Sequence, residues 1–321
     1  GNAVVIKPST DTSVTGGLLL ASIFEAAGLP KGLLNVIVGR GSEIGDEIVT
    51  HKTPRLISFT GSTDVGRHIG ELAGKGLKKT ALELGGNNVF IVMDDANIQQ
   101  AVESALFGKF YHQGQICMSI NRIFVHKKVY DEFAELFIKM AKNLKYGNPA
   151  DKDTNVGPLI NRDQVERILS DLNTSVEQGA KIRLGGTAEG NVLAPTVLTN
   201  VTNTMPIAEN EIFGPVAILI PFESEEEAIE MANVYPFGLS GSVHSTNIER
   251  GTAIAHKIHT GMIHVNDQSV NDEAHMPFGG EKDSGLGRFN GEWVLEEVTT
   301  LKWLSVQHTR SDYGPCINQL K

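Results

Sequence analysis

The stretch LISFTGSTDVGRHIGELAGKGLKKTALELGGNNVFIVM, residues 56–93, decides the fold class. Its apolar run at 56–59 and the run at 80–84 predict strands, and the segment 60–73 between them, opened by Thr-Gly-Ser, predicts a helix. A Gly-Gly break then precedes a further apolar strand at 89–93. Strand, helix and strand in this order are typical of a βαβ unit in a parallel sheet.

The same alternation continues on both sides of this stretch. Upstream, the patterns predict strands at 3–6 and 33–38 and helices at 15–27 and 43–50. Downstream, they predict helices at 97–111, 127–145, 161–178, 223–234 and 247–259, strands at 216–222 and 262–266, and a half-exposed strand at 301–309. No internal repeat interrupts the pattern. The sequence therefore predicts an α/β protein with doubly wound parallel sheets.

Composition narrows the class of protein. The formal net charge of −10 disfavours a nucleic-acid surface, which needs a basic patch. No run of 18 apolar residues could span a membrane, and the first residues lack the apolar region of a signal peptide. The two cysteines, Cys117 and Cys316, form no disulfide framework, which indicates a reducing compartment such as the cytoplasm. Because no Met opens the chain, we expect a fragment or a processed protein.

The first candidate for chemistry is Cys117, in the motif HQGQICMS at 112–119. It follows the predicted helix 97–111 in a turn that contains Gly114. A thiol in such a turn is accessible for attack on a carbonyl, and nearby backbone N–H groups would lower its pKa and hold an oxyanion. The alternative is a small buried hydrophobic residue, which is the common role of a lone cysteine.

The second candidate is Glu83, in the motif LELGG. A carboxylate between two leucines in a strand is costly unless it has a partner or lies at the strand end. The glycines that follow place it at the carboxyl end of the strand, where ligands bind in open α/β sheets. A desolvated Glu with a raised pKa could activate water, whereas the alternative is a structural Glu that caps the turn.

Three further motifs suggest ligand contacts. FTGSTDVG at 59–66 joins a strand end to a helix N-terminus, which is a ready site for a pyrophosphate, although its spacing differs from G-x-G-x-x-G. EIFGPV at 211–216 would place Glu211 and Phe213 on one strand face or in one loop. PFGGEKDSGLGR at 277–288 is too glycine-rich for a helix or a strand, so it is either a loop near a ligand or interface, or an ordinary surface loop.

Taken together, these motifs resemble the aldehyde dehydrogenase superfamily. FTGST, LELGG, the GQxC turn, EIFGPV and the PFGG-x-K-x-SG-x-GR loop occur in the order of that family, and the resemblance covers essentially the whole chain. The segment HVNDQSVNDEAHMPFGGEKDSGLGRF at 264–289 most resembles bacterial benzaldehyde- and vanillin-type dehydrogenases. The resemblance implies an oxidoreductase that uses NAD or NADP to oxidise a small aldehyde to a carboxylic acid.

By this resemblance, Cys117 attacks the aldehyde carbon to give a thiohemiacetal and, after hydride transfer, a thioester intermediate. Glu83 activates the water that hydrolyses the thioester and also serves to take the thiol proton. The Cys117 backbone N–H is one oxyanion donor.

The resemblance also assigns cofactor contacts within a Rossmann-type sheet. Lys7 and Glu211 match residues that bind the adenosine-side and nicotinamide-side riboses. Gly61 and Ser62 match the pyrophosphate contact, and Phe213 matches a residue against the nicotinamide end. No metal is implied.

The sequence departs from the family pattern in two places. The upstream strand and the Asn side chain that completes the oxyanion hole are absent, so the chain is expected to be N-terminally incomplete and nearly inactive by itself. Thr10 stands where the family often has a Glu that grips the adenosine ribose, which leaves the preference between NAD and NADP open.

The resemblance divides the chain into three parts. Residues 1–82 are expected to be part of a dinucleotide-binding domain, 83–300 the catalytic domain, and 301–321 an oligomerisation tail, with a homodimer or homotetramer as the assembly. Two other functions stay open: a cofactor-independent thiol esterase, which would turn over esters without nucleotide, and a catalytically silent truncated scaffold.

Overall fold

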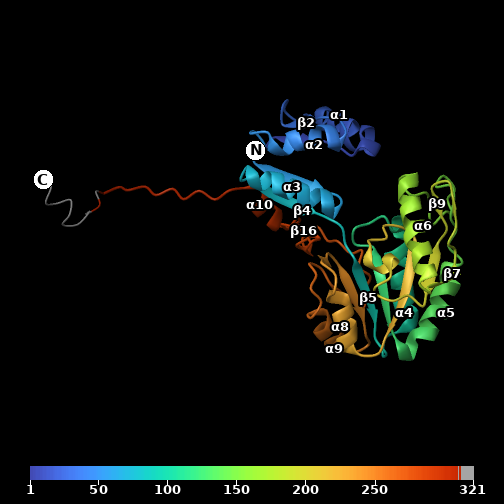
Figure 1. Ribbon diagram of the computed structural model, residues 1–321. Helices are drawn as coiled ribbons and strands as arrows, with labels where there is room; N and C mark the ends of the chain where they lie inside the picture. Colours follow the sequence, from blue (N-terminus) through green and yellow to red (C-terminus); the bar gives the residue numbers. More distant parts are fainter. Residues whose placement is uncertain (310, 312–321) are drawn as a thin grey trace.

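The computed structural model describes residues 1–309 and 311 of the chain. Its largest element is a seven-stranded sheet (Figure 1), with the strand order β14-β13-β5-β6-β11-β10-β7. The bounds of these strands are His264–Val265, Gly241–His244, Asn88–Val92, Ile120–His126, Val216–Phe222, Thr196–Thr199 and Lys181–Leu184. All neighbouring strands are parallel except β7, which runs antiparallel to β10. The predicted α/β class is confirmed, and the antiparallel edge strand makes the sheet mixed.

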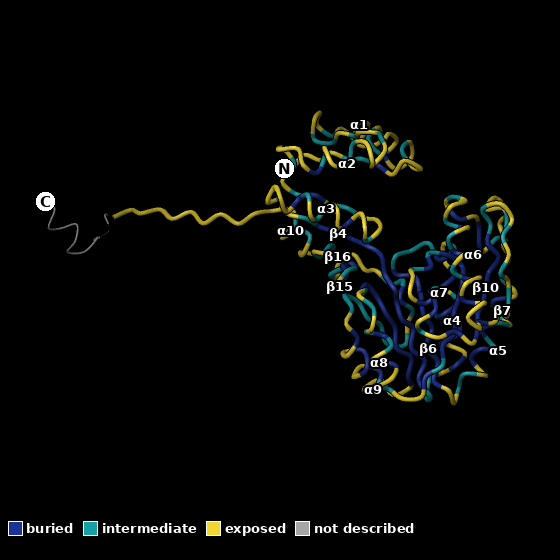
Figure 2. The backbone as a smooth tube through the Cα atoms, viewed as in Figure 1, coloured by how far each residue is buried: buried dark blue, intermediate teal, exposed yellow. Residues whose placement is uncertain are grey.

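Two hydrophobic clusters pack on opposite faces of this sheet because successive side chains of a strand point to opposite sides. Phe90 and Val92 of β5 pack with helices α4 (Ile98–Phe110) and α5 (Tyr130–Ala141). Ile91, between them, packs in the other cluster with α6, α8 and α9. These helices span Arg162–Glu177, Glu225–Asn233 and Ile248–Ala255, and the short α7 (Pro206–Glu209) joins the same cluster. Figure 2 shows the buried sheet as the dark centre of this part.

The strands of residues 1–83 form two smaller sheets. β1 (Val4–Ile6) pairs in parallel with β2 (Leu34–Val36), and β3 (Leu56–Thr60) pairs in parallel with β4 (Lys79–Glu83). The connecting helices are α1 (Leu19–Ala26), α2 (Gly41–Thr50) and α3 (Thr63–Lys75), and α1 follows the short turns η1 (Thr10–Thr12) and η2 (Val14–Leu18). The predicted strands and helices of this part are confirmed, but they form two small sheets in place of one.

The C-terminal part of the chain returns to β4. Strand β16 (Gly285–Leu286) pairs antiparallel with β4, so that Gly285 lies opposite Glu83. The remaining short elements are η3 (Tyr111–Gly114), η4 (Lys127–Val129), β8 (Ala188–Glu189), β9 (Val192–Leu193), β12 (Phe237–Gly238), β15 (Glu281–Lys282) and α10 (Trp293–Val298). The chain leaves the three-stranded sheet at Glu83 and enters the large sheet at Asn88. The domain boundary near residue 83 stays a prediction.

The predicted strand at 301–309 is wrong for the single chain. These residues adopt no secondary structure, and their side chains are exposed, because no strand of the described part of the chain lies beside them to pair with. The rest of the predicted oligomerisation tail, at 310 and 312–321, lies outside the described residues. Within the described part of the chain, no helix has the length and apolar character needed to cross a bilayer.

Candidate active site

Glu83 is a buried carboxylate without a partner. It is the last residue of β4, its exposure is 7%, and neither of its carboxylate oxygens has a hydrogen-bond partner among the described residues. Burial raises the pKa of Glu83 to about 7; the charge of Arg288 opposes this effect, and that of Asp272 adds to it. The sequence-based expectation of a desolvated Glu with a raised pKa is confirmed. Its role in activating water stays a proposal.

Cys117 lies in the turn that leads into β6 and is partly exposed. Burial raises the pKa of its thiol to about 11, and the negative charges of Glu83 and Glu211 raise it further. The backbone N–H groups of Met118 and of Cys117 itself act in the opposite direction. As expected, these two N–H groups lower the pKa of the thiol. Desolvation raises this pKa by more, so the expected low thiol pKa is wrong.

The same pKa effects indicate that Cys117, Glu83 and Glu211 lie near one another. The charges of Glu83 and Glu211 act on the same thiol, although the three residues lie far apart in the sequence. The fold therefore gathers the predicted nucleophile and two of the predicted partner residues into one site.

The segment before Cys117 has an unusual backbone. His112 and Gln113 have positive φ values of 50° and 57°, and Gly114 follows with a φ of 71°. A Cβ on Gly114 would lie 2.4 Å from the carbonyl oxygen of Gly214, so only glycine lets the two loops come this close. Non-glycine residues in this conformation cluster at functional sites.

Glu211 and Phe213 lie in one loop before β11, which confirms one of the two predicted arrangements. The Glu211 Oε1 accepts a hydrogen bond of 2.9 Å from the Gly86 backbone N–H. Burial raises the pKa of Glu211, and the Gly86 N–H opposes that effect. Gln164 Nε2 donates to the Phe213 carbonyl at 3.0 Å and so holds the second half of the loop.

Gly61 and Ser62 directly precede α3. The Gly61 backbone N–H donates to the Glu83 carbonyl at 3.0 Å, which places the helix N-terminus beside the Glu83 turn. A Cβ on Gly61 would lie 2.4 Å from the ring of Phe59, so a side chain here would displace that ring. Ser62 is the N-cap residue, and its side chain makes no capping hydrogen bond. The first backbone N–H groups of α3 are therefore free of a side-chain cap and can donate hydrogen bonds to an anion.

Lys7 is the one candidate that the structure does not bring to this group. It follows β1 in the separate two-stranded sheet, and its Nζ donates to the carbonyl of the adjacent Pro8 at 2.6 Å. Within the described residues it makes no hydrogen bond to the segments that carry Glu83, Cys117 or Glu211.

The structure adds a buried polar network that the sequence patterns did not reveal. Arg122 is 1% exposed, and its Nε donates to the Asn87 Oδ1 at 2.7 Å. Asn121 Nδ2 donates to the same oxygen, and Asn121 Oδ1 accepts from the Ile212 N–H at 2.8 Å. This network joins the turn after Glu83 to the Glu211 loop. Its one signal in the sequence is an Asn-Arg pair within the apolar run INRIFV.

Lys109 is a second residue that sequence reasoning missed. It is 1% exposed at the end of α4, and its Nζ donates to the Ile120 carbonyl at 2.8 Å. Burial lowers the pKa of Lys109 to about 7, while the negative charge of Glu211 opposes this effect. A lysine in the last turn of a helix is ordinary in a sequence, so nothing there signals its burial.

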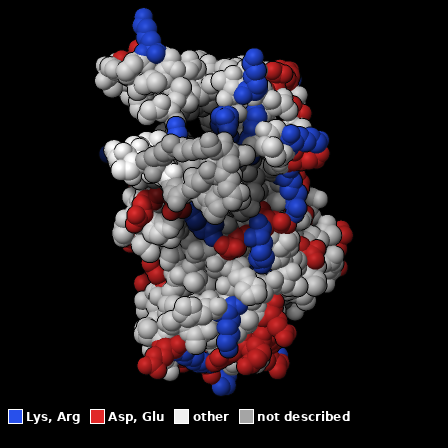
Figure 3. Space-filling model, turned by 90° about the vertical axis from the view of Figure 1, so that its left-hand side faces the viewer, with Lys and Arg blue, Asp and Glu red and all other residues white. Residues whose placement is uncertain are grey.

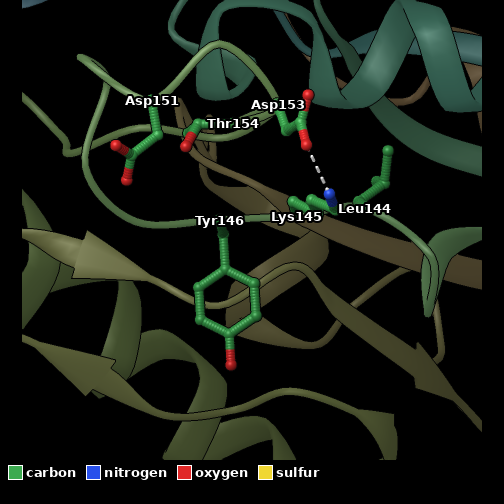
Figure 4. A pocket seen from close by; sticks show the side chains of 6 residues that line it. All are labelled: Leu144, Lys145, Tyr146, Asp151, Asp153 and Thr154. Atoms are coloured by element: carbon green, nitrogen blue, oxygen red, sulfur yellow. Dashed lines mark hydrogen bonds and ion pairs between the residues drawn. The ribbon is translucent and has the colours of Figure 1, made fainter.

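Neither of two surface hollows is lined by Glu83, Cys117 or Glu211. One hollow of about 490 Å³, lined by residues 144–146, 151, 153 and 154, holds the ion pair Lys145–Asp153 at 2.7 Å and none of the candidate residues (Figure 4). A second, of about 350 Å³, includes Asp272, whose charge acts on Glu83. The face in Figure 3 carries acidic and basic side chains side by side. The described residues include no His, Cys, Asp and Glu cluster that could hold a metal ion.

Comparisons with known proteins give a consistent result. The family model described as the aldehyde dehydrogenase family matches residues 1–304. The chain is 55% identical to a benzaldehyde dehydrogenase of Bacillus subtilis, over 98% of this chain and 64% of the relative. It is 50% identical to a vanillin dehydrogenase of Corynebacterium glutamicum, over 96% of this chain and 64% of the relative. The chain thus spans less than two thirds of the length of these relatives.

Solved structures agree. A salicylaldehyde dehydrogenase from Pseudomonas putida G7 superposes with a TM-score of 0.94 at 40% identity, over 97% of this chain and 65% of that chain. A betaine aldehyde dehydrogenase from Staphylococcus aureus in complex with NAD⁺ superposes with a TM-score of 0.88 at 39% identity, over 92% of this chain and 59% of that chain.

Proposed function

This chain belongs to the aldehyde dehydrogenase family, and from that premise we propose that it carries the catalytic core of an NAD- or NADP-dependent oxidation of an aromatic aldehyde to a carboxylic acid. The observation that carries this proposal is the buried Glu83 carboxylate, which has no hydrogen-bond partner among the described residues and acts electrostatically on the Cys117 thiol. A carboxylate left unpaired in this way is costly, so it points to a function in chemistry.

Cys117 is the nucleophile in the proposed reaction. Its sulfur forms a bond to the aldehyde carbon, the thiol proton leaves, and the carbonyl oxygen becomes that of a thiohemiacetal. Because the pKa of the thiol is about 11, little thiolate exists at neutral pH, and ionised Glu83 serves to accept the proton. The bound dinucleotide supplies the acceptor for the hydride that the thiohemiacetal carbon loses.

Glu83 acts again when the resulting thioester is hydrolysed. It takes a proton from water, the water oxygen bonds to the acyl carbon, and the carbon–sulfur bond breaks to release the acid and the thiol. A pKa of about 7 suits a general base at neutral pH, because about half of the Glu83 population is ionised there.

The residues around Glu83 fit a dinucleotide. The uncapped N-terminus of α3 at Gly61 and Ser62 would hold the pyrophosphate, and Glu211 would accept from a ribose hydroxyl. A Cβ on Gly85 would lie 2.8 Å from Glu211 Oε2, so glycine keeps this surface open. Phe213 would pack at the nicotinamide end, and Lys7 would bind the other ribose.

The aromatic substrate class rests on the relatives, which include benzaldehyde, vanillin and salicylaldehyde dehydrogenases. Assembly as a homodimer or homotetramer is part of the same proposal, and the exposed apolar side chains of Leu301, Trp303 and Leu304 offer it a contact surface. A cytoplasmic location rests on the cysteine content of the chain.

The proposal is tested with benzaldehyde and either NAD or NADP, by following reduced cofactor and the mass of the Cys117 peptide. In a chain extended to the length of its relatives, we expect both cofactor reduction and an acyl group on Cys117, whereas residues 1–321 alone should give little of either. Ester hydrolysis that needs no nucleotide, without any aldehyde oxidation, would support a thiol esterase in place of a dehydrogenase. Absence of both reactions and of any acyl group would support a silent scaffold.

A further inference from the structure

The residue that holds the Cys117 turn in place is Asn88, at the start of β5. Its side-chain Nδ2 donates to the carbonyl of Cys117 at 2.7 Å and to the carbonyl of Ser119 at 2.8 Å. Its Oδ1 accepts from the Ser240 backbone N–H at 2.9 Å, and the residue is 3% exposed. Both amide protons and the amide oxygen of Asn88 are therefore hydrogen-bonded to backbone groups.

Gly86 leaves the space in which this contact forms. A Cβ on Gly86 would lie 2.8 Å from the Cys117 carbonyl oxygen and 3.0 Å from Asn88 Oδ1. Any side chain at this position would therefore push the Cys117 carbonyl away from Asn88.

The direction of the Cys117 carbonyl also fixes the direction of the Met118 N–H. The peptide bond between these residues is trans, as are all those in the described chain. In a trans peptide, the C=O and the N–H of the same plane point in opposite directions. Because Asn88 binds the carbonyl in the interior, the Met118 N–H points in the opposite direction within the peptide plane. This N–H lowers the pKa of the Cys117 thiol, against the opposing effect of burial.

We propose that Asn88 is a positioning residue for Cys117, which fixes the Cys117 carbonyl and thereby holds the Met118 N–H against the sulfur. The Asn88 amide does not contact the reacting atoms; it acts through the peptide unit between Cys117 and Met118. This inference rests on Cys117 being the nucleophile of the proposed function. It goes beyond that function by assigning a role to a residue that no motif marks.

A neighbouring hydrogen bond provides a control for this mechanism. Ser269 Oγ donates to the Met118 carbonyl at 2.7 Å. That carbonyl shares its plane with the Ser119 N–H, which donates to the Ile116 carbonyl at 2.9 Å and not to the thiol. Loss of the Ser269 hydroxyl should therefore loosen the same turn without moving the Met118 N–H.

A matched control for stability lies elsewhere in the chain. Asn233 uses its side chain as Asn88 does, since its Nδ2 donates to the Lys257 carbonyl and its Oδ1 accepts from the His259 N–H, each at 2.8 Å. Asn233→Ala therefore removes two side-chain hydrogen bonds to the backbone at a partly buried position away from Cys117, against three in Asn88→Ala.

The experiment measures the rate at which iodoacetamide alkylates Cys117 between about pH 7 and about pH 10, where the thiolate fraction determines the rate. The readout is the mass of the Cys117 peptide, and glutathione in the same tube serves as the reference thiol. Asn88→Ala should slow alkylation about tenfold at a given pH, because one pKa unit is a tenfold change in thiolate. Gly86→Ala, which displaces the carbonyl while keeping Asn88, should do the same.

Ser269→Ala and Asn233→Ala should stay close to the wild-type rate. Equal rates for Asn88→Ala and Asn233→Ala would overturn the assignment of Asn88, as would a comparable loss in Ser269→Ala. If Asn88→Ala fails to fold, Gly86→Ala decides by the same criterion. Failure of the proposed function would look different: aldehyde oxidation would be absent, while the alkylation rates would still separate Asn88→Ala from the two controls.

Discussion

Glu211 accepts a hydrogen bond of 2.9 Å from the backbone N–H of Gly86, although 125 residues separate the two in the sequence. The bond joins the turn that follows Glu83 to the loop that precedes β11. The positions of Glu83, the predicted general base, and of Glu211, a predicted cofactor contact, depend on this bond. A shift of either loop changes the distance of both carboxylates from Cys117.

Cys117→Ala should abolish formation of the acyl adduct and aldehyde oxidation while dinucleotide binding persists, because the sulfur is the atom that bonds to the aldehyde carbon. Mass spectrometry after mixing aldehyde and NAD, together with cofactor binding by fluorescence, measures both effects. Cys316→Ala is the matched control and should behave as the wild type. Near-normal turnover in Cys117→Ala would refute the nucleophile assignment.

Glu83→Gln should slow hydrolysis of the thioester by about 10²–10⁴-fold, the usual contribution of a general base. The acyl-enzyme should then accumulate on Cys117 and be seen by rapid-quench mass spectrometry. The exposed Glu132 on α5 provides the control Glu132→Gln. Unchanged turnover without any adduct in Glu83→Gln would rule out this role for Glu83.

The hydrolysis step should speed up as pH rises through about 7, since Glu83 must lose its proton to act as a base. The rate of single-turnover deacylation against pH measures this profile. Glu83→Gln should show no such rise near pH 7. A wild-type profile that is flat between about pH 6 and about pH 8 would contradict the assignment.

Glu83→Gln should also stabilise the fold at alkaline pH. Burial raises the pKa of Glu83 from 4.5 to about 7, so the folded chain holds this proton more tightly than the unfolded chain. Stability is therefore lost as pH rises between these values, and the variant avoids this loss, by up to about 3 kcal/mol above pH 7. Urea unfolding of both proteins tests this. A variant less stable than the wild type at about pH 8 would contradict it.

Lys109→Met should change how stability depends on pH in the alkaline range. Burial lowers the pKa of Lys109 from 10.5 to about 7, so between these values the unfolded chain binds the extra proton and wild-type stability gains from rising pH. The difference between wild type and variant should then shift by up to about 1.4 kcal/mol per pH unit. The exposed Lys142→Met, directly after α5, is the control and should give a constant difference.

Thr10→Glu should shift cofactor preference toward NAD. Thr10 is exposed at the start of η1, three residues after Lys7, and a carboxylate there would repel a 2′-phosphate. The ratio of kcat/KM for NAD to that for NADP should rise by at least about tenfold, or about 1.4 kcal/mol. Thr12→Glu, at the other end of the same turn, is the control. An unchanged ratio in Thr10→Glu would show that other residues set the preference.

Local patterns in the sequence determined the class of the fold and most of its elements. The apolar run at 89–93 and the helical pattern at 97–111 reappear as β5 and α4 with their ends shifted by at most a residue. Such patterns are reliable because side-chain periodicity follows from backbone geometry alone. The family motifs likewise named Cys117, Glu83 and Glu211 before any contact between them was known.

Features that require contact between segments distant in the sequence were decided only by the tertiary structure. The pKa of Cys117 follows from burial and from two carboxylates remote in sequence, which no local pattern contains. Asn88 looks like an ordinary residue after a glycine pair, yet its amide holds the carbonyl of Cys117. The segment 301–309 alternates large and polar residues as a strand would, but no described strand lies beside it, so it forms no strand. Periodicity shows which face of an element is buried, while hydrogen bonds and desolvation depend on what the fold brings against that face.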